Sequence, residues 1–252
     1  MTHPRANDSS RPSPRQQDTN ILKRALIVIE PPLNQIALPP EIATLRIDPA
    51  APLVVVDVDE VLAMFMRGFE RFLVSHGLEV RLDRFALFQN IFRPGESEHL
   101  DVAAGRKLFE LFFETDVEDI DPAPGAAEAL GGLARHASIV ILTNAPQQSR
   151  TPRARWLVKH DFDYPFVINT GPKGPAVAAI RAMTTGKAAF VDDLLPNLDS
   201  VAKEAPDVAT FQMVADQRLR PLAYEAPDRH PRLDDWWDLG PAIAAAIGVA
   251  NS

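Results

Sequence analysis

Seven polar residues stand at the ends of apolar runs or at the start of a helical pattern, where side chains of their kinds could do chemistry. They are Asp57, Asp59, Thr143, Asn144, Lys173, Asp192 and Asp193. A carboxylate can act as a nucleophile, as a general acid and base, or as an oxygen ligand of Mg²⁺. Two like charges about 4 Å apart repel by roughly 4 kcal/mol at an effective dielectric constant of about 20, so gathered carboxylates need a counter-ion. The set therefore predicts a site for a divalent cation, with Lys173 offsetting part of the remaining charge.

The apolar runs that carry these residues have the length and continuity of strands buried on both faces. They are 53–57, 138–142, 164–168, 188–192 and 208–214, with helical patterns between the later runs at 147–160, 175–183 and 196–204. Continuous apolar strands spaced by helices predict an α/β fold with a doubly wound parallel sheet. Ligands bind outside the carboxyl ends of the strands in such a sheet, so we expect the polar residues to gather at one edge.

The connection after the first strand is much longer than one crossover helix requires, since the next strand begins only near Ser138. Apolar residues recur every three or four positions between Val61 and Leu73, and a second helical pattern runs over about 100–113. We predict a small helical cap, inserted after strand 1 at about 63–120. The insert is rich in phenylalanine, which either forms the core of the cap or lines an apolar pocket for a ring or an acyl group.

The rest of the chain divides by composition. Residues 1–20 are dominated by Pro, Ser, Arg, Asn, Asp and Gln and are predicted to be a disordered tail. Residues 21–52 carry short apolar runs broken by proline pairs, which predicts an irregular N-terminal extension to the folded domain at 53–250. The acidic and tryptophan pair at 234–237 is predicted to cap and dock a last helix over 239–247.

Composition excludes several classes of function. The 252 residues include no cysteine, which rules out disulfides, thiolate zinc sites and cysteine nucleophiles and fits the cytoplasm. The net charge of −8 argues against a nucleic-acid partner, and no apolar stretch approaches the roughly 20 residues of a membrane span. The six histidines lack metal-ligand spacing and are predicted to lie at the surface or at helix ends. The oligomeric state stays open.

Four ordered motifs resemble those of the haloacid dehalogenase (HAD) superfamily, whose members are mostly phosphatases. The matching segments, in order and spacing, are Val54–Leu62, Ile139–Asn144, Lys173 and Phe190–Asp193. Each motif is weak alone, and the ordered set is strong; it covers about residues 53–215. The stretch at 57–65 and the segment at 121–125 are also somewhat similar to the 5′-deoxyribonucleotidase branch.

The resemblance implies a role for each polar residue. Asp57 would be the nucleophile that forms an aspartyl-phosphate, and Asp59 the general acid that later acts as a base. Thr143 and Lys173 would hold phosphoryl oxygens, with Asn144 beside them in substrate binding. The Mg²⁺ ligands would be a carboxylate oxygen of Asp57, the backbone carbonyl of Asp59 and one carboxylate of the acidic pair. Asp193 is favoured over Asp192 within that pair.

The expected activity is hydrolysis of a small phosphomonoester. Asp59 favours phosphate transfer over dehalogenation, because a halide leaves without protonation. A nucleotidase-like phosphatase, a phosphotransferase and an inactive Mg²⁺-binding interaction module are the alternatives. Position 60 departs from the resemblance, since it is Glu where many members carry Gly or another small residue. The Glu60 carboxylate would either raise neighbouring pKa values or face solvent, and we expect it to face solvent.

Overall fold

The computed structural model describes residues 37–249, so the predictions for the tail and for most of the N-terminal extension lie outside the described residues. The described end of that extension forms one 3₁₀ turn, η2 (Pro40–Thr44), with Ile42 buried. The chain then enters the first strand. No helix in residues 37–249 has the length and apolarity needed to cross a lipid bilayer.

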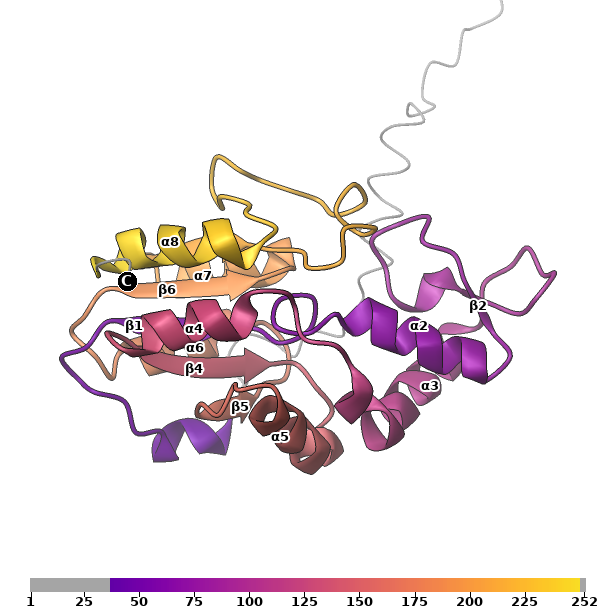
Figure 1. Cartoon of the computed structure of the whole chain (residues 1–252), viewed down its shortest axis with the longest axis horizontal. Coiled ribbons are helices and arrows are strands. Elements are labelled where there is room, and N and C mark those ends of the chain that lie inside the picture. Colours follow the sequence, from indigo (N-terminus) through magenta and orange to yellow (C-terminus); the bar gives the residue numbers. More distant parts are fainter. Residues whose placement is uncertain (1–36, 250–252) are drawn as a thin grey trace, which may run out of the picture. The chain divides into compact units, whose positions relative to one another are not determined.

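A parallel sheet of five strands forms the centre, in the order β5-β4-β1-β6-β7 (Figure 1). The strands are β1 (Leu53–Val56), β4 (Ser138–Thr143), β5 (Phe166–Ile168), β6 (Ala188–Asp192) and β7 (Val208–Gln212). Successive strands are added first on one side of β1 and then on the other, which confirms the doubly wound sheet. The carboxyl end of β1 therefore lies where the strand order reverses, which is where α/β sheets bind ligands.

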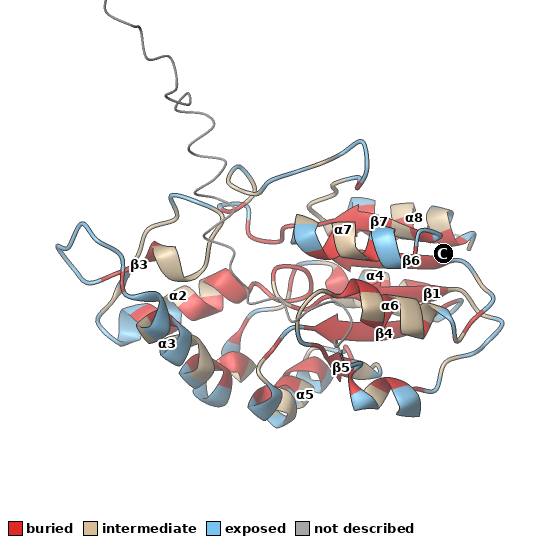
Figure 2. Ribbon diagram, turned by 180° about the vertical axis from the view of Figure 1, so that it is seen from behind, coloured by how far each residue is buried: buried red, intermediate tan, exposed pale blue. Residues whose placement is uncertain are grey.

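Helices cover both faces of the sheet, because alternate residues of each strand point to opposite sides. Val54 and Val56 belong to the core shared with α4 (Ala126–Ala134), α5 (Arg150–Lys159) and α8 (Trp236–Ile247). Leu53 and Val55 belong to the core shared with α6 (Gly174–Arg181) and α7 (Leu195–Glu204). Figure 2 shows the buried strands between helices whose outer faces are exposed.

The last helix begins three residues earlier than predicted. Asp235 is its N-cap and accepts a hydrogen bond from the Asp238 amide at 3.0 Å. Trp236 lies inside the helix and is buried, and its indole Nε1 donates to the Val61 carbonyl at 3.0 Å. The capping role is confirmed for Asp235 and the docking role for Trp236, whereas Trp237 is exposed.

The long connection after β1 forms a cap, with helices α2 (Phe65–Ser75) and α3 (Val102–Thr115). Between them lies a two-stranded antiparallel ribbon, β2 (Glu79–Val80) paired with β3 (Ile91–Phe92). The prediction of helices alone was wrong for this part of the insert. Strands of two residues are too short to show a period in the sequence.

The phenylalanines of α2 and α3 pack against one another. Phe69 stands at the centre, with its ring centroid 5.6 Å from that of Phe65 and 5.2 Å from that of Phe112. Phe113 lies 5.9 Å from Phe65 in the same cluster, and all four rings are buried. This packing supports the view that the aromatic residues form the core of the cap.

Candidate active site

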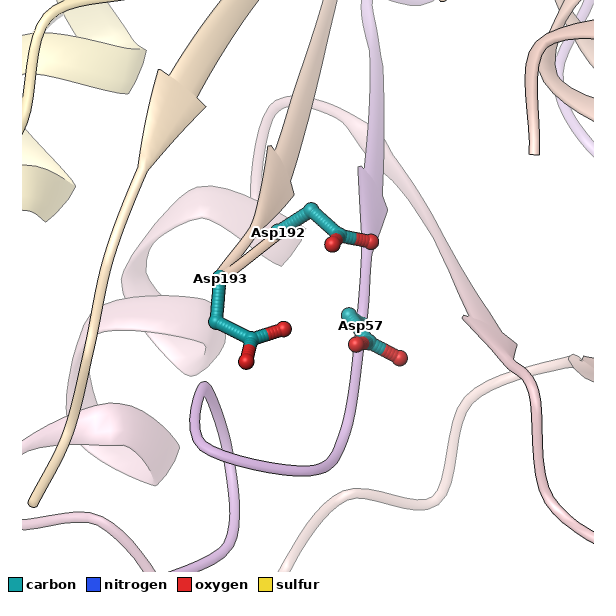
Figure 3. A group of neighbouring side chains, drawn as sticks. All are labelled: Asp57, Asp192 and Asp193. Atoms are coloured by element: carbon teal, nitrogen blue, oxygen red, sulfur yellow. The ribbon is translucent and has the colours of Figure 1, made fainter. Parts of the chain in front are cut away.

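The carboxyl ends of β1 and β6 bring three carboxylates together. Asp57 follows β1, Asp192 ends β6 and Asp193 comes next, and the two strands are adjacent, with Val56 in register with Val191. One oxygen from each carboxylate lies within 4.8 Å of the others, and the three side chains converge in Figure 3. All three residues are at most 9% exposed, so water screens their charges little.

Lys173 supplies a positive charge to this group. It is the N-cap of α6 and fully buried, and its Nζ lies 2.6 Å from Asp57 Oδ1 and 2.7 Å from Asp192 Oδ2. Burial acts to lower the pKa of Lys173, but the two carboxylates outweigh it and hold the pKa above its ordinary value. Lys173 is therefore a fixed cation, and one ammonium faces three carboxylates.

The negative charge that Lys173 does not offset contributes to raised pKa values of Asp57 and Asp193. Burial raises the pKa of Asp57 to about 7, with Lys173 opposing the rise and Asp192 adding to it. Burial, followed by the charges of Asp192 and Asp57, raises the pKa of Asp193 well above its ordinary value. Protein groups alone thus leave these carboxylates short of positive charge. A hard divalent cation takes oxygen ligands of this kind, so the donor set fits Mg²⁺.

The two neighbouring aspartates differ in what already holds them. Asp192 accepts hydrogen bonds from Lys173, from the Leu194 amide at 2.9 Å and from Asn197 Nδ2 at 3.0 and 3.2 Å. The carboxylate of Asp193 accepts no hydrogen bond from any residue between 37 and 249, while Gln212 Nε2 holds its backbone carbonyl at 3.0 Å. Asp193 is accordingly the acid with oxygens left for a ligand.

Thr143 is the last residue of β4, the strand beside β1, and Asn144 follows it. The Thr143 hydroxyl is buried and has no hydrogen-bond partner within the described part of the chain. Asn144 is occupied: its Nδ2 donates to the Gly171 carbonyl at 3.0 Å, and its Oδ1 accepts from Asn169 Nδ2 at 2.9 Å. Asn144 thus fixes the loop that leads to Lys173, whereas the Thr143 hydroxyl is free for a ligand oxygen.

Asp59 lies just beyond the carboxylate cluster, with its side chain 24% exposed. Its Oδ1 accepts a hydrogen bond from Arg153 Nη2 at 2.7 Å. Arg153 belongs to α5 and is fully buried. Sequence reasoning missed this arginine, because the run of basic residues in α5 is typical of a solvated helix face.

Glu60 does not face solvent, so that prediction was wrong. The residue is 4% exposed and has a φ of 59°, in the left-handed region that favours glycine. Its Oε1 accepts from the Met66 amide at 2.7 Å and its Oε2 from the Asp216 amide at 2.9 Å. Burial raises the pKa of Glu60 to about 7 despite these two hydrogen bonds. Glu60 joins the turn after β1 to the first turn of the cap and to the segment after β7.

His230 also departs from its prediction, because it is 1% exposed. Its Nδ1 is hydrogen-bonded to Thr210 Oγ1 at 2.7 Å, and its Nε2 lies 3.0 Å from Asp199 Oδ1. His230 lies between β7 and α8, and its ring links this segment to both β7 and α7. The group of metal-type ligands found in residues 37–249 consists of Asp57, Asp192 and Asp193.

Comparison with known proteins places the fold. No protein-family model matches the chain, and no curated protein matches it in sequence. Solved structures do match: the HAD hydrolase YfnB of Bacillus subtilis, bound to magnesium, is 12% identical with a TM-score of 0.54, covering 77% of this chain and 99% of its own. A haloacid dehalogenase-like hydrolase of Streptococcus pneumoniae is 10% identical with a TM-score of 0.51, covering 77% and 98%. A haloacid dehalogenase-like protein of unknown function from Agrobacterium tumefaciens is 17% identical with a TM-score of 0.50, covering 77% and 97%.

The chain therefore has the fold of the haloacid dehalogenase-like hydrolases. The resemblance drawn from four short motifs is confirmed at the level of the fold, and each of these matches covers 77% of the chain.

Proposed function

We propose that this protein is a Mg²⁺-dependent phosphohydrolase of a small phosphomonoester, acting through an aspartyl-phosphate at Asp57. The observation that carries the proposal is the group of three buried carboxylates within 4.8 Å of one another, opposed by a single lysine. The group lies at the strand-order reversal of a haloacid dehalogenase-like fold. A cluster with unmet negative charge at such a point favours binding of a metal and an anionic substrate together.

Each residue has a separate task in the reaction. An oxygen of Asp57 attacks phosphorus, the bond from phosphorus to the ester oxygen breaks, and Asp59 gives that oxygen a proton. Asp59 then takes a proton from water as the water oxygen attacks the aspartyl-phosphate. Inorganic phosphate leaves, and the Asp57 carboxylate and the Asp59 acid are restored. Thr143 donates a hydrogen bond to a phosphoryl oxygen, and Lys173 offsets the charge that develops there.

The metal would be held by a carboxylate oxygen of Asp57, the backbone carbonyl of Asp59 and Asp193, with Asp192 beyond the first ligands. It would supply positive charge that neutralises the phosphate and favours the ionised form of Asp57. Asp192 suits the outer place, because its oxygens already accept hydrogen bonds from Lys173, Leu194 and Asn197.

The substrate is proposed to be small, because the cap adjoins the carboxyl ends of the strands and the net charge of −8 disfavours large anionic partners. The lack of cysteine favours the cytoplasm as the location. The net charge of −8 disfavours a nucleic-acid partner, and no membrane partner is proposed. A nucleotidase-like phosphatase and a phosphotransferase use the same first step, so they differ from this proposal in substrate and in acceptor. An inactive Mg²⁺-binding interaction module would keep the metal site and lack turnover.

The test is a panel of nucleotides, sugar phosphates, amino-acid phosphates and p-nitrophenyl phosphate, assayed with Mg²⁺ and after metal stripping with EDTA. Turnover should require the divalent cation, and quenched enzyme should carry the mass of one phosphoryl group. Asp57→Asn should lose both properties, whereas Asp228→Asn, at an exposed carboxylate, should keep both. Release of phosphate to an added alcohol instead of water would identify a phosphotransferase. Rates unchanged by EDTA, or a fully active Asp57→Asn free of deamidation by mass spectrometry, would overturn the proposal.

A further inference from the structure

Arg153 is a buried cation that the reaction described above does not use. Arg153 is fully buried. Of its three guanidinium nitrogens only Nη2 donates a hydrogen bond to a residue in 37–249, to Asp59 Oδ1 at 2.7 Å. Nε and Nη1 are buried and have no hydrogen-bond partner within residues 37–249. A buried guanidinium with unpaired donors opposes folding, so its presence calls for a reason other than stability.

The surroundings of Arg153 fix the direction of the guanidinium. Its Cζ lies 5.0 Å from the ring centroid of Phe113 in the cap helix α3 and 5.6 Å from that of Trp156 in α5. Trp156 is itself held, since its Nε1 donates to the Ile120 carbonyl at 2.8 Å, just after the cap helices. Aromatic faces attract a cation, and they also leave it few positions. Arg153 therefore presents one nitrogen to Asp59 from a fixed place where cap and sheet domain meet.

Asp59 needs such a partner, because the rest of its carboxylate is free. Its side chain is 24% exposed, and no other hydrogen bond from residues 37–249 reaches either of its oxygens. A side chain with one oxygen held and the other free is oriented in the way that a proton donor requires. Misplacement of a reacting group by about 1 Å can lower a rate about 10²-fold.

We propose that Arg153 is a positioning residue for Asp59: it holds Oδ1 and so directs Oδ2 to the leaving-group oxygen. This inference rests on the proposed function, because it assigns Arg153 to the acid of that reaction. It also makes the orientation of the acid depend on the cap, since the Phe113 ring forms one wall around the guanidinium. In this proposal Arg153 acts only through its hydrogen bond to Asp59 Oδ1.

The rival explanation is that Arg153 only fills space between α5 and the cap. The two explanations differ in their consequences. Arg153→Met removes two buried donors that have no partner within residues 37–249, and the Asp59 carboxylate left behind is 24% exposed and can be hydrated, so the variant should fold with a thermal midpoint close to that of the wild type. A structural arginine would, when replaced, lower all activities together. A positioning arginine affects only the step that needs the proton.

The experiment compares p-nitrophenyl phosphate, whose leaving group is a stable anion, with the best alkyl phosphate of the panel, whose leaving oxygen needs a proton. Arg153→Met should lower kcat about 10- to 100-fold on the alkyl phosphate and less than about 3-fold on p-nitrophenyl phosphate, with KM little changed. Arg153→Lys, which keeps the charge, should restore part of the loss. Arg155→Met is the matched control, because Arg155 lies on the same helix, is exposed and pairs with Glu118.

The double variant Asp59→Asn/Arg153→Met gives the sharpest reading. If Arg153 acts through Asp59, the double variant should lose no more activity than Asp59→Asn alone, because the two residues form one unit. Equal losses of Arg153→Met on both substrates, or additive losses in the double variant, would overturn the inference. If Arg153→Met fails to fold, Arg153→Lys carries the same two-substrate comparison.

Failure of the proposed function would look different. The wild type would then lack metal-dependent turnover, or Asp59→Asn would itself show no dependence on the leaving group. Normal behaviour of the wild type, Asp57→Asn and Asp59→Asn, together with unchanged alkyl phosphate turnover in Arg153→Met, would reject the role of Arg153 alone.

Discussion

Two sets of buried acids lie at or near the turn that follows β1. They differ in how fully the neighbouring residues supply them with hydrogen bonds and cations. In the first set, which we call the turn set, both carboxylate oxygens of Glu60 accept hydrogen bonds from backbone amides, and Asp216 forms ion pairs with Arg218 and Arg67. Burial acts to raise the pKa of Asp216, yet Arg218 holds it below its ordinary value. In the second set, which we call the strand-end set, Asp57 and Asp192 share the ammonium of Lys173, and the Asp193 carboxylate lies within 4.8 Å of theirs without an ion pair of its own among residues 37–249.

The contrast separates acids that serve the fold from acids that serve a ligand. Both oxygens of Glu60 have hydrogen-bond donors within the chain and Asp216 has its cations there, so the structure explains these two acids without a bound group. The strand-end set has one ammonium for three carboxylates, and the Thr143 hydroxyl beside it has no hydrogen-bond partner within residues 37–249. Buried polar groups are ordinarily paired, so this group of exceptions is where we expect a ligand to bind.

Removal of Lys173 should break the strand-end set most severely. Lys173→Met leaves three buried carboxylates without a cation, and breaking a buried ion pair in this way costs about 3–5 kcal/mol of unfolding free energy. We expect that loss in metal-free urea unfolding at pH 8, together with a fall in kcat of about 10²–10³-fold. The loss of stability should shrink at pH 5, where Asp57 is protonated, because the pKa of Asp57 is about 7.

Lys203→Met is the control for that experiment, since Lys203 is an exposed lysine paired with Glu204. Its unfolding free energy should stay within about 0.5 kcal/mol of the wild type. A Lys173→Met protein as stable at pH 8 as at pH 5 would show that Lys173 does not compensate the three carboxylates.

The metal-free protein should lose stability as the pH rises through the raised pKa values of Asp57 and Asp193. The pKa of Asp57 rises from 3.8 to about 7 on folding, so the folded state binds more protons between these values than the unfolded state. The stabilising contribution is complete below about pH 4 and lost as the pH passes about 7. Asp57→Asn has no such proton to lose, so it should exceed the wild type by about 2–4 kcal/mol at pH 8 and match it near pH 4.

Mg²⁺ gives the second half of that measurement. Added Mg²⁺ should stabilise the wild type more at pH 8 than at pH 5, because protons and the cation compete for the same oxygens. Asp57→Asn, which has lost one ligand, should respond less. Parallel stability curves for the two proteins between pH 4 and pH 8 would contradict the assignment of the raised pKa to Asp57.

The sheet and the strand-end carboxylates were accessible from the sequence because both follow from local rules. A strand buried on both faces must be apolar throughout, as in Leu53–Val56, and residues that follow parallel strands must meet at one edge. Thr143, Asp57 and Asp192 therefore lie at that edge as the runs predicted. The roles assigned to them stay predictions until they are measured.

Arg153, Glu60 and His230 could not be placed from sequence, because their burial depends on distant segments. Arg153 lies over the Phe113 ring of the cap, Glu60 accepts a hydrogen bond from the Asp216 amide, and His230 is hydrogen-bonded to Thr210. A charged residue in a basic helix or after a strand has the same sequence signature whether or not another segment covers it. The left-handed φ of Glu60 did leave a trace, since many members of the resembled family carry Gly at the corresponding position.

The turn set should respond in stability more than in chemistry. Glu60→Ala leaves the amides of Met66 and Asp216 buried without acceptors, at about 1–3 kcal/mol of unfolding free energy. Glu60→Gly loses the same hydrogen bonds but relieves the left-handed backbone, so it should be more stable than Glu60→Ala by about 0.5–1 kcal/mol. Urea unfolding of both variants gives the two terms. Glu98→Ala, at an exposed glutamate, should change little, and a Glu60→Gly protein less stable than Glu60→Ala would show that the backbone is not strained.

The smallest change in stability, and the finest comparison, comes from one substitution at two strands. Thr143 ends β4 with a buried hydroxyl that has no partner among residues 37–249, whereas Thr210 in β7 is hydrogen-bonded to His230 at 2.7 Å. Valine has nearly the shape of threonine and suits a strand. Thr143→Val removes an unpaired hydroxyl, so its unfolding free energy should change by less than about 1 kcal/mol, while Thr210→Val should lose about 1–2 kcal/mol with its hydrogen bond.

Activity should follow the opposite order in these two variants. The hydroxyl of Thr143 is free for a phosphoryl oxygen, so Thr143→Val should lower kcat about 10²-fold, as removal of one donor to a developing charge does. Thr210→Val has no such donor to lose and should keep wild-type turnover when assayed well below its unfolding temperature. A Thr143→Val enzyme with full activity and a large loss of stability would place Thr143 with Glu60 and Asp216, among the groups that serve the fold. Low activity with nearly unchanged stability would place the Thr143 hydroxyl with the strand-end carboxylates. A bound ligand would then be the hydrogen-bond partner that residues 37–249 do not provide.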